Sequence, residues 1–304
     1  MGASKAALGA RAALAALAAG ALVAVVLVAL VVGSAASRRG GPLIPRVIHQ
    51  THEGPFEMLP EQYKRNTRRF LRENPTFEYR YYSAAQCEAF ILTRYGAEML
   101  AVYRSINPAY GPARADLFRY LLMYEEGGVY LDMKSGPTVP LTETIRPTDE
   151  FLLSNWCEGA CGRTHWESFV RTGFGEYQQW WIACRPKHPF LRAVIDRCVQ
   201  NIREYVHDAS DRTTFGKLGV LILTGPIAYT QAIHPLVPAA MRAGECRFAP
   251  SSLGGALQYN RTGIDHTTLY ARHYSTLRGP IVAPSVPAAV AGSAGLPARG
   301  LAAA

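Results

Sequence analysis

Four charged residues in the middle of the chain have the types and spacing to bind a sugar phosphate. Asp116 and Arg119 stand three positions apart, so they share one face of a helix. Asp132 follows the apolar run 129–131, and Lys134 comes two positions later. Ligands of open α/β sheets bind at the carboxyl ends of strands. An acid and a base held there can bind hydroxyls and phosphates. The alternative for Asp116 and Arg119 is a surface salt bridge.

A helix predicted over 112–126 must position the first two of these residues. Pro112 suits the first helical turn, and Gly127 and Gly128 end the helix. Apolar residues at i, i+3, i+4 and i+7 form its core stripe: Leu117, Tyr120, Leu121 and Tyr124. Residues 129–131 then predict a buried strand with Asp132 at its carboxyl end.

The remaining patterns predict an α/β fold. Helical periodicity occurs over 60–73, 85–103, 189–206 and 225–233, and strand patterns occur over 46–49 and 77–82. Strands that alternate with helices favour a mainly parallel sheet. The 304 residues suffice for one large domain or two small ones, with tails.

An uncharged run of Ala, Leu, Val and Gly over 12–32 is long enough to cross a hydrocarbon core. We therefore expect a short cytoplasmic tail over 1–11, a transmembrane signal-anchor over 12–33 and a linker over 34–43. A globular domain over 44–279 and a disordered tail over 280–304 follow. A cleaved signal peptide is the alternative, because small residues occupy 33–37. The glycosylation pattern at Asn260 suits a lumenal domain.

Composition excludes some classes of protein. The net charge of +9 comes from scattered basic residues, so anionic substrates or membrane headgroups are better partners than nucleic acid. The six cysteines lack the clustered spacing of a zinc site. They are either buried thiols or, in a lumenal domain, members of one or two disulfides, with Cys157 and Cys161 as the local candidate pair.

The segment around Asp116 and Asp132 resembles a known family. Its pattern A-R-x-D-x-x-R-Y…G-G-V-Y-x-D is similar to the sugar-binding region of glycosyltransferase family 32. That family includes initiating α-1,6-mannosyltransferases, inositol-phosphoceramide mannosyltransferases and α-1,4-galactosyltransferases. Further blocks at 44–51, 74–79, 186–190 and 224–226 match in the expected order, so the resemblance covers 44–279.

The resemblance implies a GT-A-type fold, with a single nucleotide-sugar-binding domain and retaining transfer that usually uses Mn²⁺. By position, Asp116 and Arg119 match residues that hold the donor sugar and phosphate. Asp132 matches the first acidic residue of the Asp-x-Asp motif, and Tyr130 in the same block is expected at the donor site. We expect catalytic roles for Asp132 and for Lys134, which stands two positions later.

Lys134 departs from the family pattern, because the second acidic residue of the motif stands at this position in relatives. A carboxylate is an oxygen ligand for Mn²⁺, whereas a charged ammonium has no lone pair to offer. This puts the metal in doubt. Two readings remain open: Lys134 itself stabilises the departing diphosphate, or a turn carries it into solvent.

The resemblance also implies roles for residues outside this segment. His49 and Gln179 are candidates for donor binding, although His49 is equally a core or capping residue. His273 stands where the family has a late histidine near the metal, and it joins Asp132 as a candidate ligand. Tryptophans in the middle third either stack on sugar rings or belong to the core: Trp156, Trp166, Trp180 and Trp181.

These features predict a retaining, membrane-anchored hexosyltransferase that acts on a glycan or glycolipid acceptor. The resemblance suggests mannose from GDP-mannose first and galactose from UDP-galactose second. The expected location is a type II membrane protein of the Golgi or another secretory membrane. The alternatives are a catalytically degenerate nucleotide-sugar-binding subunit, which Lys134 favours, and a membrane-tethered lectin-like protein.

Overall fold

The computed structural model describes residues 41–156, 166–263 and 273–283. The described residues from Pro42 onward form one compact unit. The predicted anchor at 12–33 lies outside the described residues. Within the described residues, no single helix is both long and apolar enough to cross a bilayer, and only the bent pair Gly216–Ile233 and Val237–Ala243 reaches that length together.

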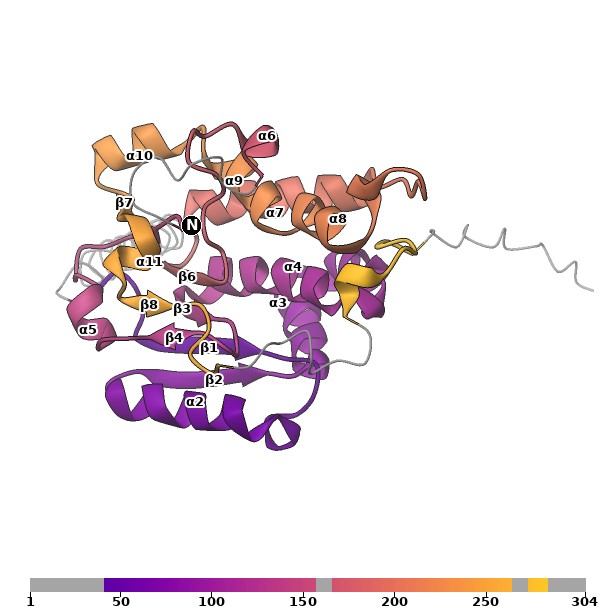
Figure 1. Ribbon diagram of the computed structural model, residues 1–304. Helices are drawn as coiled ribbons and strands as arrows, with labels where there is room; N and C mark the ends of the chain where they lie inside the picture. The colour runs from indigo at the N-terminus through magenta and orange to yellow at the C-terminus, as the bar shows by residue number, and fades with distance from the viewer. Residues whose placement is uncertain (1–40, 157–165, 264–272, 284–304) are drawn as a thin grey trace, which may run out of the picture. The chain divides into compact units, whose positions relative to one another are not determined.

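A mixed six-stranded sheet forms the centre of this unit (Figure 1). Its strand order is β2 (Glu78–Tyr82), β1 (Val47–Thr51), β3 (Gly128–Leu131), β6 (Trp181–Cys184), β5 (Phe151–Leu153) and β7 (Arg247–Phe248). Strand β1 pairs in parallel with both β2 and β3. Strand β6 is antiparallel to β3 and to β5, and β7 is parallel to β5. The expected α/β fold is confirmed, although two antiparallel pairings interrupt the parallel ones.

Helices cover the sheet and connect its strands. The α-helices are α2 (Glu61–Glu73), α3 (Ala84–Ser105), α4 (Gly111–Glu126), α5 (Leu141–Thr144), α6 (Glu167–Val170), α7 (Pro189–Arg203), α8 (Gly216–Leu223), α9 (Pro226–Ile233), α10 (Val237–Ala243) and α11 (Pro250–Gly254). Short 3₁₀ turns include η2 (Pro108–Tyr110) and η5 (Tyr274–Thr276), and β4 (Gly136–Pro137) pairs with β8 (Leu257–Gln258). All five predicted helices and all three predicted strands are present, with ends that differ by a few residues.

Two hydrophobic clusters cover opposite faces of the sheet. Val129 and Leu131 pack in the cluster that contains Phe70 of α2, whereas Tyr130 packs with α3, α4, α7, α8 and α9. This alternation follows the two-residue period of a strand. Figure 1 shows the same arrangement, with α2 on one side of the sheet and α4 and α7 on the other. Helix α4 lies in the larger cluster and is buried on most of its surface.

Ordered packing continues past the predicted boundary at Gly279. Ile281 is completely buried in the larger cluster, its carbonyl accepts from Asn107 N at 2.7 Å, and Ala283 N donates to Ser105 O at 2.7 Å. The apolar pair Ile281 and Val282 therefore belongs to the core, although the sequence around it is rich in Ala, Pro and Gly. Residues 284–304 lie outside the described part.

The described cysteines are unpaired. Cys87, Cys184, Cys198 and Cys246 are buried free thiols. Burial raises the pKa of Cys87 to about 12, which keeps it protonated at neutral pH. The candidate disulfide between Cys157 and Cys161 lies outside the described residues.

Two glycines join α4 to β3 directly and so fix where the helix and the strand meet. Gly127 has φ +63° and Gly128 has φ +92°, a region that residues with a side chain rarely adopt. A Cβ at Gly128 would stand 2.6 Å from Val47 O of the neighbouring strand. Only glycine fits there, which explains the pair predicted to end the helix.

Replacing Gly128 should therefore destabilise the protein. We expect Gly128→Ala to lower the free energy of unfolding by about 1–3 kcal/mol from backbone strain alone, with a further loss from the contact with Val47. The matched control is Gly244→Ala, whose φ is +77° but whose Cβ would meet nothing within 4 Å. Urea denaturation measures both variants. An equal loss of unfolding free energy in Gly128→Ala and Gly244→Ala would contradict a close contact between Gly128 and β1.

Candidate active site

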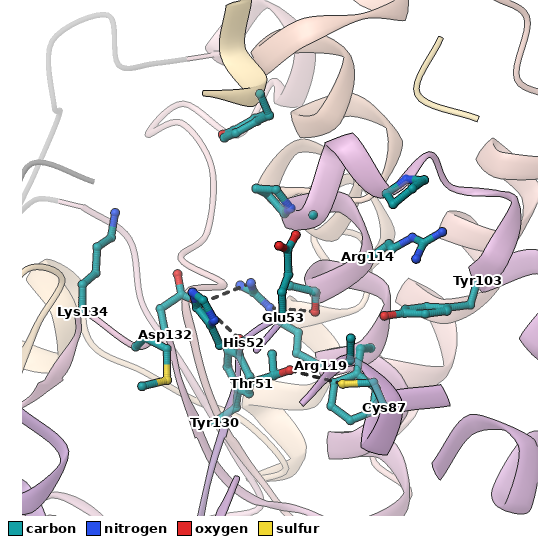
Figure 2. A pocket seen from close by; sticks show the side chains of 18 of the residues that line it. Thr51, His52, Glu53, Cys87, Tyr103, Arg114, Arg119, Tyr130, Asp132 and Lys134 are labelled. Atoms are coloured by element: carbon teal, nitrogen blue, oxygen red, sulfur yellow. Dashed lines mark hydrogen bonds and ion pairs between the residues drawn. The ribbon is translucent and has the colours of Figure 1, made fainter. Parts of the chain in front are cut away.

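A cavity of about 610 Å³ opens at the carboxyl ends of the parallel strands β1 and β3 (Figure 2). Strand β1 contributes Thr51 and the two residues after it, His52 and Glu53. Strand β3 contributes Tyr130 and, after its last residue, Asp132. Helices α3 and α4 supply an inner wall that includes Cys87, Tyr103 and Phe118. The order β2-β1-β3 makes this edge a topological switch point, where α/β proteins bind ligands.

Arg119 is the centre of a buried ion-pair network at the cavity. Its Nη2 lies 3.2 Å from Asp116 Oδ1 and 3.1 Å from Asp132 Oδ1. Its Nη1 donates to the carbonyl oxygen of Gln179 at 2.8 Å and also contacts the side-chain oxygen of Gln179. Tyr130 presents its ring to the guanidinium, with Cζ 4.7 Å from the ring centroid. The arginine is held from several sides.

The carboxylates of this network have different surroundings. Asp116 is buried, and its Oδ2 accepts from Thr224 Oγ1 at 3.2 Å while Gln179 Nε2 donates to its Oδ1 at 3.1 Å. Asp132 has a side chain 25% exposed, lines the cavity and accepts from Tyr130 OH at 3.2 Å. Asp116 thus acts through Arg119, whereas Asp132 can meet a ligand directly.

Electrostatics follow from this burial. Loss of hydration raises the pKa of Asp116 to about 6, and the nearby Asp132 charge acts in the same direction, while Arg119 opposes both. The two carboxylates raise the pKa of Arg119, so its charge is permanent. A fixed cation at a cavity that binds phosphate requires no reorganisation when the ligand arrives.

Lys134 lines the same cavity, although it lies beyond the end of β3. Strand β3 ends at Leu131, and Met133 and Lys134 form a turn that Ser135 N closes on Asp132 O at 2.9 Å. The predicted turn is therefore present. It does not carry Lys134 into solvent, because Lys134 is 8% exposed and its Nζ lies 3.9 Å from the ring centroid of Tyr259.

The other predicted residues divide into two groups. His273 lines the cavity together with Tyr274, and its Nδ1 lies 2.7 Å from Ser275 Oγ. His49 and Gln179 are not among the cavity-lining residues. His49 is buried, its Nε2 donates to Gly127 O at 3.1 Å, and burial lowers its pKa to about 4, so it is a neutral core residue between β1 and α4. The donor-binding roles assigned to these residues stay predictions.

The described residues do not by themselves fit a divalent cation. Among residues 41–156, 166–263 and 273–283, no group of three or more His, Cys, Asp or Glu side chains could hold a metal ion. Asp132 Oδ1 is already paired with Arg119, and Lys134 stands where the second carboxylate of the motif is expected. A hard cation prefers several oxygen ligands, which this set does not supply.

Sequence reasoning missed the residues after β1. Thr51, His52 and Glu53 line the cavity because β1 is the parallel neighbour of β3, and their carboxyl ends share one edge. The same rule that indicated Asp132 could have indicated them. Tyr259 follows β8 and reaches Lys134 through tertiary packing, for which the sequence carried no local signal.

The fold and the cavity define an α/β protein with a cavity at the carboxyl ends of parallel strands, lined in part by a buried arginine. Residues 60–152 match the family described as "Glycosyltransferase sugar-binding region containing DXD motif". This segment contains the Arg119 network with the exception of Thr224 and Gln179. The resemblance to glycosyltransferase family 32 is thereby confirmed.

Curated relatives are mannosyltransferases and related synthases. An initiation-specific α-1,6-mannosyltransferase of Schizosaccharomyces pombe is 28% identical over 200 residues, 62% of this chain and 48% of the relative. A mannosyl phosphorylinositol ceramide synthase of Saccharomyces cerevisiae is 28% identical over 46% of this chain and 37% of the relative. An inositol phosphoceramide mannosyltransferase of S. pombe is 33% identical over 37% and 32%. The chain spans about half the length, or less, of these relatives.

Among solved structures, the PaToxG glycosyltransferase has a TM-score of 0.46 at 17% identity, over 66% of this chain and 72% of that one.

Asp116 should give stability a pH dependence of its own. Because its folded pKa is about 6 and its usual value is 3.8, the native state binds the proton more tightly than the unfolded state. Its contribution to stability is therefore greatest below about pH 4 and declines as pH rises through 6. We expect the difference in melting temperature between the parent and Asp116→Asn to change over this window. Curves that stay parallel from pH 4 to 7 would contradict the raised pKa.

Proposed function

We propose that this chain is a retaining hexosyltransferase that takes mannose from GDP-mannose, with UDP-galactose as the second candidate donor. The observation that carries the proposal is Arg119, a buried cation shared by Asp116 and Asp132, at a cavity outside the parallel strands. Relatives named as mannosyltransferases support the sugar. The acceptor that we propose is a glycan or a glycolipid.

The cavity has two ends that suit the two parts of such a donor. Figure 2 shows Asp132 and Lys134 on one side, and Cys87, Tyr103 and Arg114 on the other. Arg114 lies over the ring of Tyr103, with Cζ 5.4 Å from the centroid. An aromatic wall suits a nucleoside, and the charged end suits a diphosphate and its sugar.

The proposed reaction breaks the bond between the anomeric carbon and the diphosphate oxygen, and the electron pair leaves with the diphosphate. An acceptor hydroxyl oxygen bonds to the same carbon and gives its proton to the departing diphosphate. Negative charge grows on the departing diphosphate, so cations placed nearby stabilise the transition state. Arg119 and Lys134 are the cations at the charged end. Asp132 is the exposed carboxylate there, and we assign it to the sugar hydroxyls.

We further propose that residues 12–33 anchor the chain as a type II membrane protein of the Golgi or another secretory membrane, with the domain over 44–279 in the lumen. The uncharged run over 12–32 and the glycosylation pattern at Asn260 support this location.

A second candidate function is nucleotide-sugar binding without transfer, as a subunit of a glycosyltransferase complex. Lys134 in place of the second acidic residue favours it. Both functions require donor binding, and only the first requires turnover. A donor-hydrolysis assay with a panel of nucleotide sugars, run with and without Mn²⁺, separates the two. If the chain binds GDP or UDP but neither hydrolyses nor transfers any donor, the result supports the second function, nucleotide-sugar binding without transfer.

Asp132 should be needed for both binding and turnover. A hydrogen bond to a charged group contributes roughly 1.5–3 kcal/mol, so we expect Asp132→Asn to weaken donor binding about tenfold or more and to lower turnover. Calorimetry with the donor and a transfer assay measure the two effects. The matched control is Asp149→Asn, which alters a buried carboxylate paired with Arg247 outside the cavity at 2.5 Å. A similar loss of donor affinity in both variants would contradict the role of Asp132.

Lys134 should supply charge at the diphosphate. We expect Lys134→Ala to lower transfer by about tenfold or more, because it removes a cation from a partly desolvated site. Lys134→Asp should regain some activity only with added Mn²⁺. The matched control is Lys187→Ala, since Lys187 also lies over an aromatic ring, that of Tyr124, but does not line the cavity. Full metal-free activity of Lys134→Ala, or an absolute Mn²⁺ requirement of the parent, would refute this role.

A further inference from the structure

Three aromatic residues form a cluster beside the cavity. The ring of Tyr259 lies 5.3 Å from that of Trp156 and 5.4 Å from that of Trp180, at steep angles to both. Trp156 is 44% exposed and Tyr259 is 37% exposed, whereas Trp180 is buried. The planes of Trp156 and Tyr259 are nearly perpendicular, at 88°. The two exposed rings thus make a corner open to solvent, with Trp180 against both.

This corner adjoins the charged end of the cavity without being part of it. None of the three rings is among the cavity-lining residues. Two contacts nevertheless connect them: Lys134 Nζ lies 3.9 Å from the centroid of Tyr259, and Asp132 N donates to Trp180 O at 2.9 Å. Burial raises the pKa of Tyr259, and the nearby charge of Asp132 acts in the same direction. A ligand in the corner would therefore lie next to the sugar end of the donor.

The exposed indole is held in place by a buried carboxylate. Trp156 Nε1 donates to Glu176 Oε1 at 3.0 Å, and Glu176 is 5% exposed. An exposed tryptophan without such a bond would lose conformational freedom on binding a ligand, which lowers affinity. A fixed aromatic surface avoids much of that cost.

Trp180 adds an unused hydrogen-bond donor. Its Nε1 is buried and has no hydrogen-bond partner among the described residues. A buried polar group without a partner costs roughly 1–3 kcal/mol. Because this N–H is buried, Trp180 serves the corner by packing against the rings of Trp156 and Tyr259, not by donating to a ligand.

We propose that Trp156, Tyr259 and Trp180 form the acceptor site, and that the ligand is a six-membered polyol ring. The apolar C–H face of such a ring packs on the exposed indole, and its hydroxyls can bind near Lys134. The corner lies apart from the aromatic wall of the cavity, so acceptor and donor can bind together. This inference rests on the proposed transferase function, and it names the residues and chemistry of the second substrate.

The same ring chemistry has two sources: a pyranose at the end of a glycan, and the inositol headgroup of a lipid. Methyl α-D-mannopyranoside and myo-inositol represent them. Saturation-transfer difference NMR measures binding of each to the full chain in the presence of GDP and, separately, UDP. We expect at least one of the two polyols to bind, and the one that binds more tightly identifies the source.

Variants assign the binding to the corner. We expect Trp156→Ala to weaken polyol binding roughly tenfold, and Trp156→Phe, which keeps an aromatic face, to weaken it by less. The matched control is Trp166→Ala, because Trp166 is a partly buried tryptophan that packs on Phe169 away from the corner. We expect that control to bind like the parent.

Two outcomes would overturn the inference: neither polyol binds the parent, or Trp156→Ala binds as tightly as the parent and as Trp166→Ala. The NMR measurement does not need turnover, so its failure differs from a failure of the proposed function. The proposed function fails instead if the parent neither binds GDP or UDP nor hydrolyses any nucleotide sugar. Melting temperatures of all variants identify any that do not fold.

Discussion

The shared ion pair of Arg119 with Asp116 and Asp132 is the interaction on which the rest of the site depends. A buried cation is tolerable only if it is neutralised and hydrogen-bonded. Asp116 lies one helical turn away on α4, whereas Asp132 lies past the end of β3. The pair therefore ties a helix to a strand end. It also leaves one carboxylate buried for structure and one exposed for a ligand.

The change of strand direction in the sheet completes this arrangement. Parallel strands β1 and β3 bring two carboxyl ends together, and these ends bear the cavity. Antiparallel β6 then runs beside β3, so the residues that precede β6 arrive at the same edge. Gln179 reaches Arg119 from there, and Trp180 O accepts from Asp132 N. A wholly parallel sheet would bring the end of a strand, and not the start of one, to this position.

Much of the fold could be predicted from the sequence, because α2, α4 and α7 have clear periodicity and α4 ends at a glycine pair. The short strands β5 and β6 were not predicted, since three or four apolar residues carry no period that distinguishes strand from helix. Asp116, Arg119 and Asp132 were found because helix spacing and a strand end are local features. The place of Lys134 was beyond such reasoning, because a turn and the distant Tyr259 determine it. His49 had two interpretations, donor binding and a core or capping role, and its buried side chain faces Gly127 O, as the second describes.

Contacts of the C-terminal segment connect one wall of the cavity to the start of α4. Asn107 donates its backbone N–H to Ile281 O at 2.7 Å and its Nδ2 to Pro280 O at 3.2 Å, and Tyr110 OH donates to Gly279 O at 2.7 Å, immediately before α4 begins. The same C-terminal segment carries His273 and Tyr274 into the cavity wall. One wall is thus fastened to the start of the helix that carries Arg119. A ligand that binds the folded cavity, and not the unfolded chain, stabilises the state in which this segment is packed against the domain. By linkage, ligand binding therefore makes transient opening of the segment rarer. Slower amide exchange at 279–283 would be a remote report of an occupied cavity.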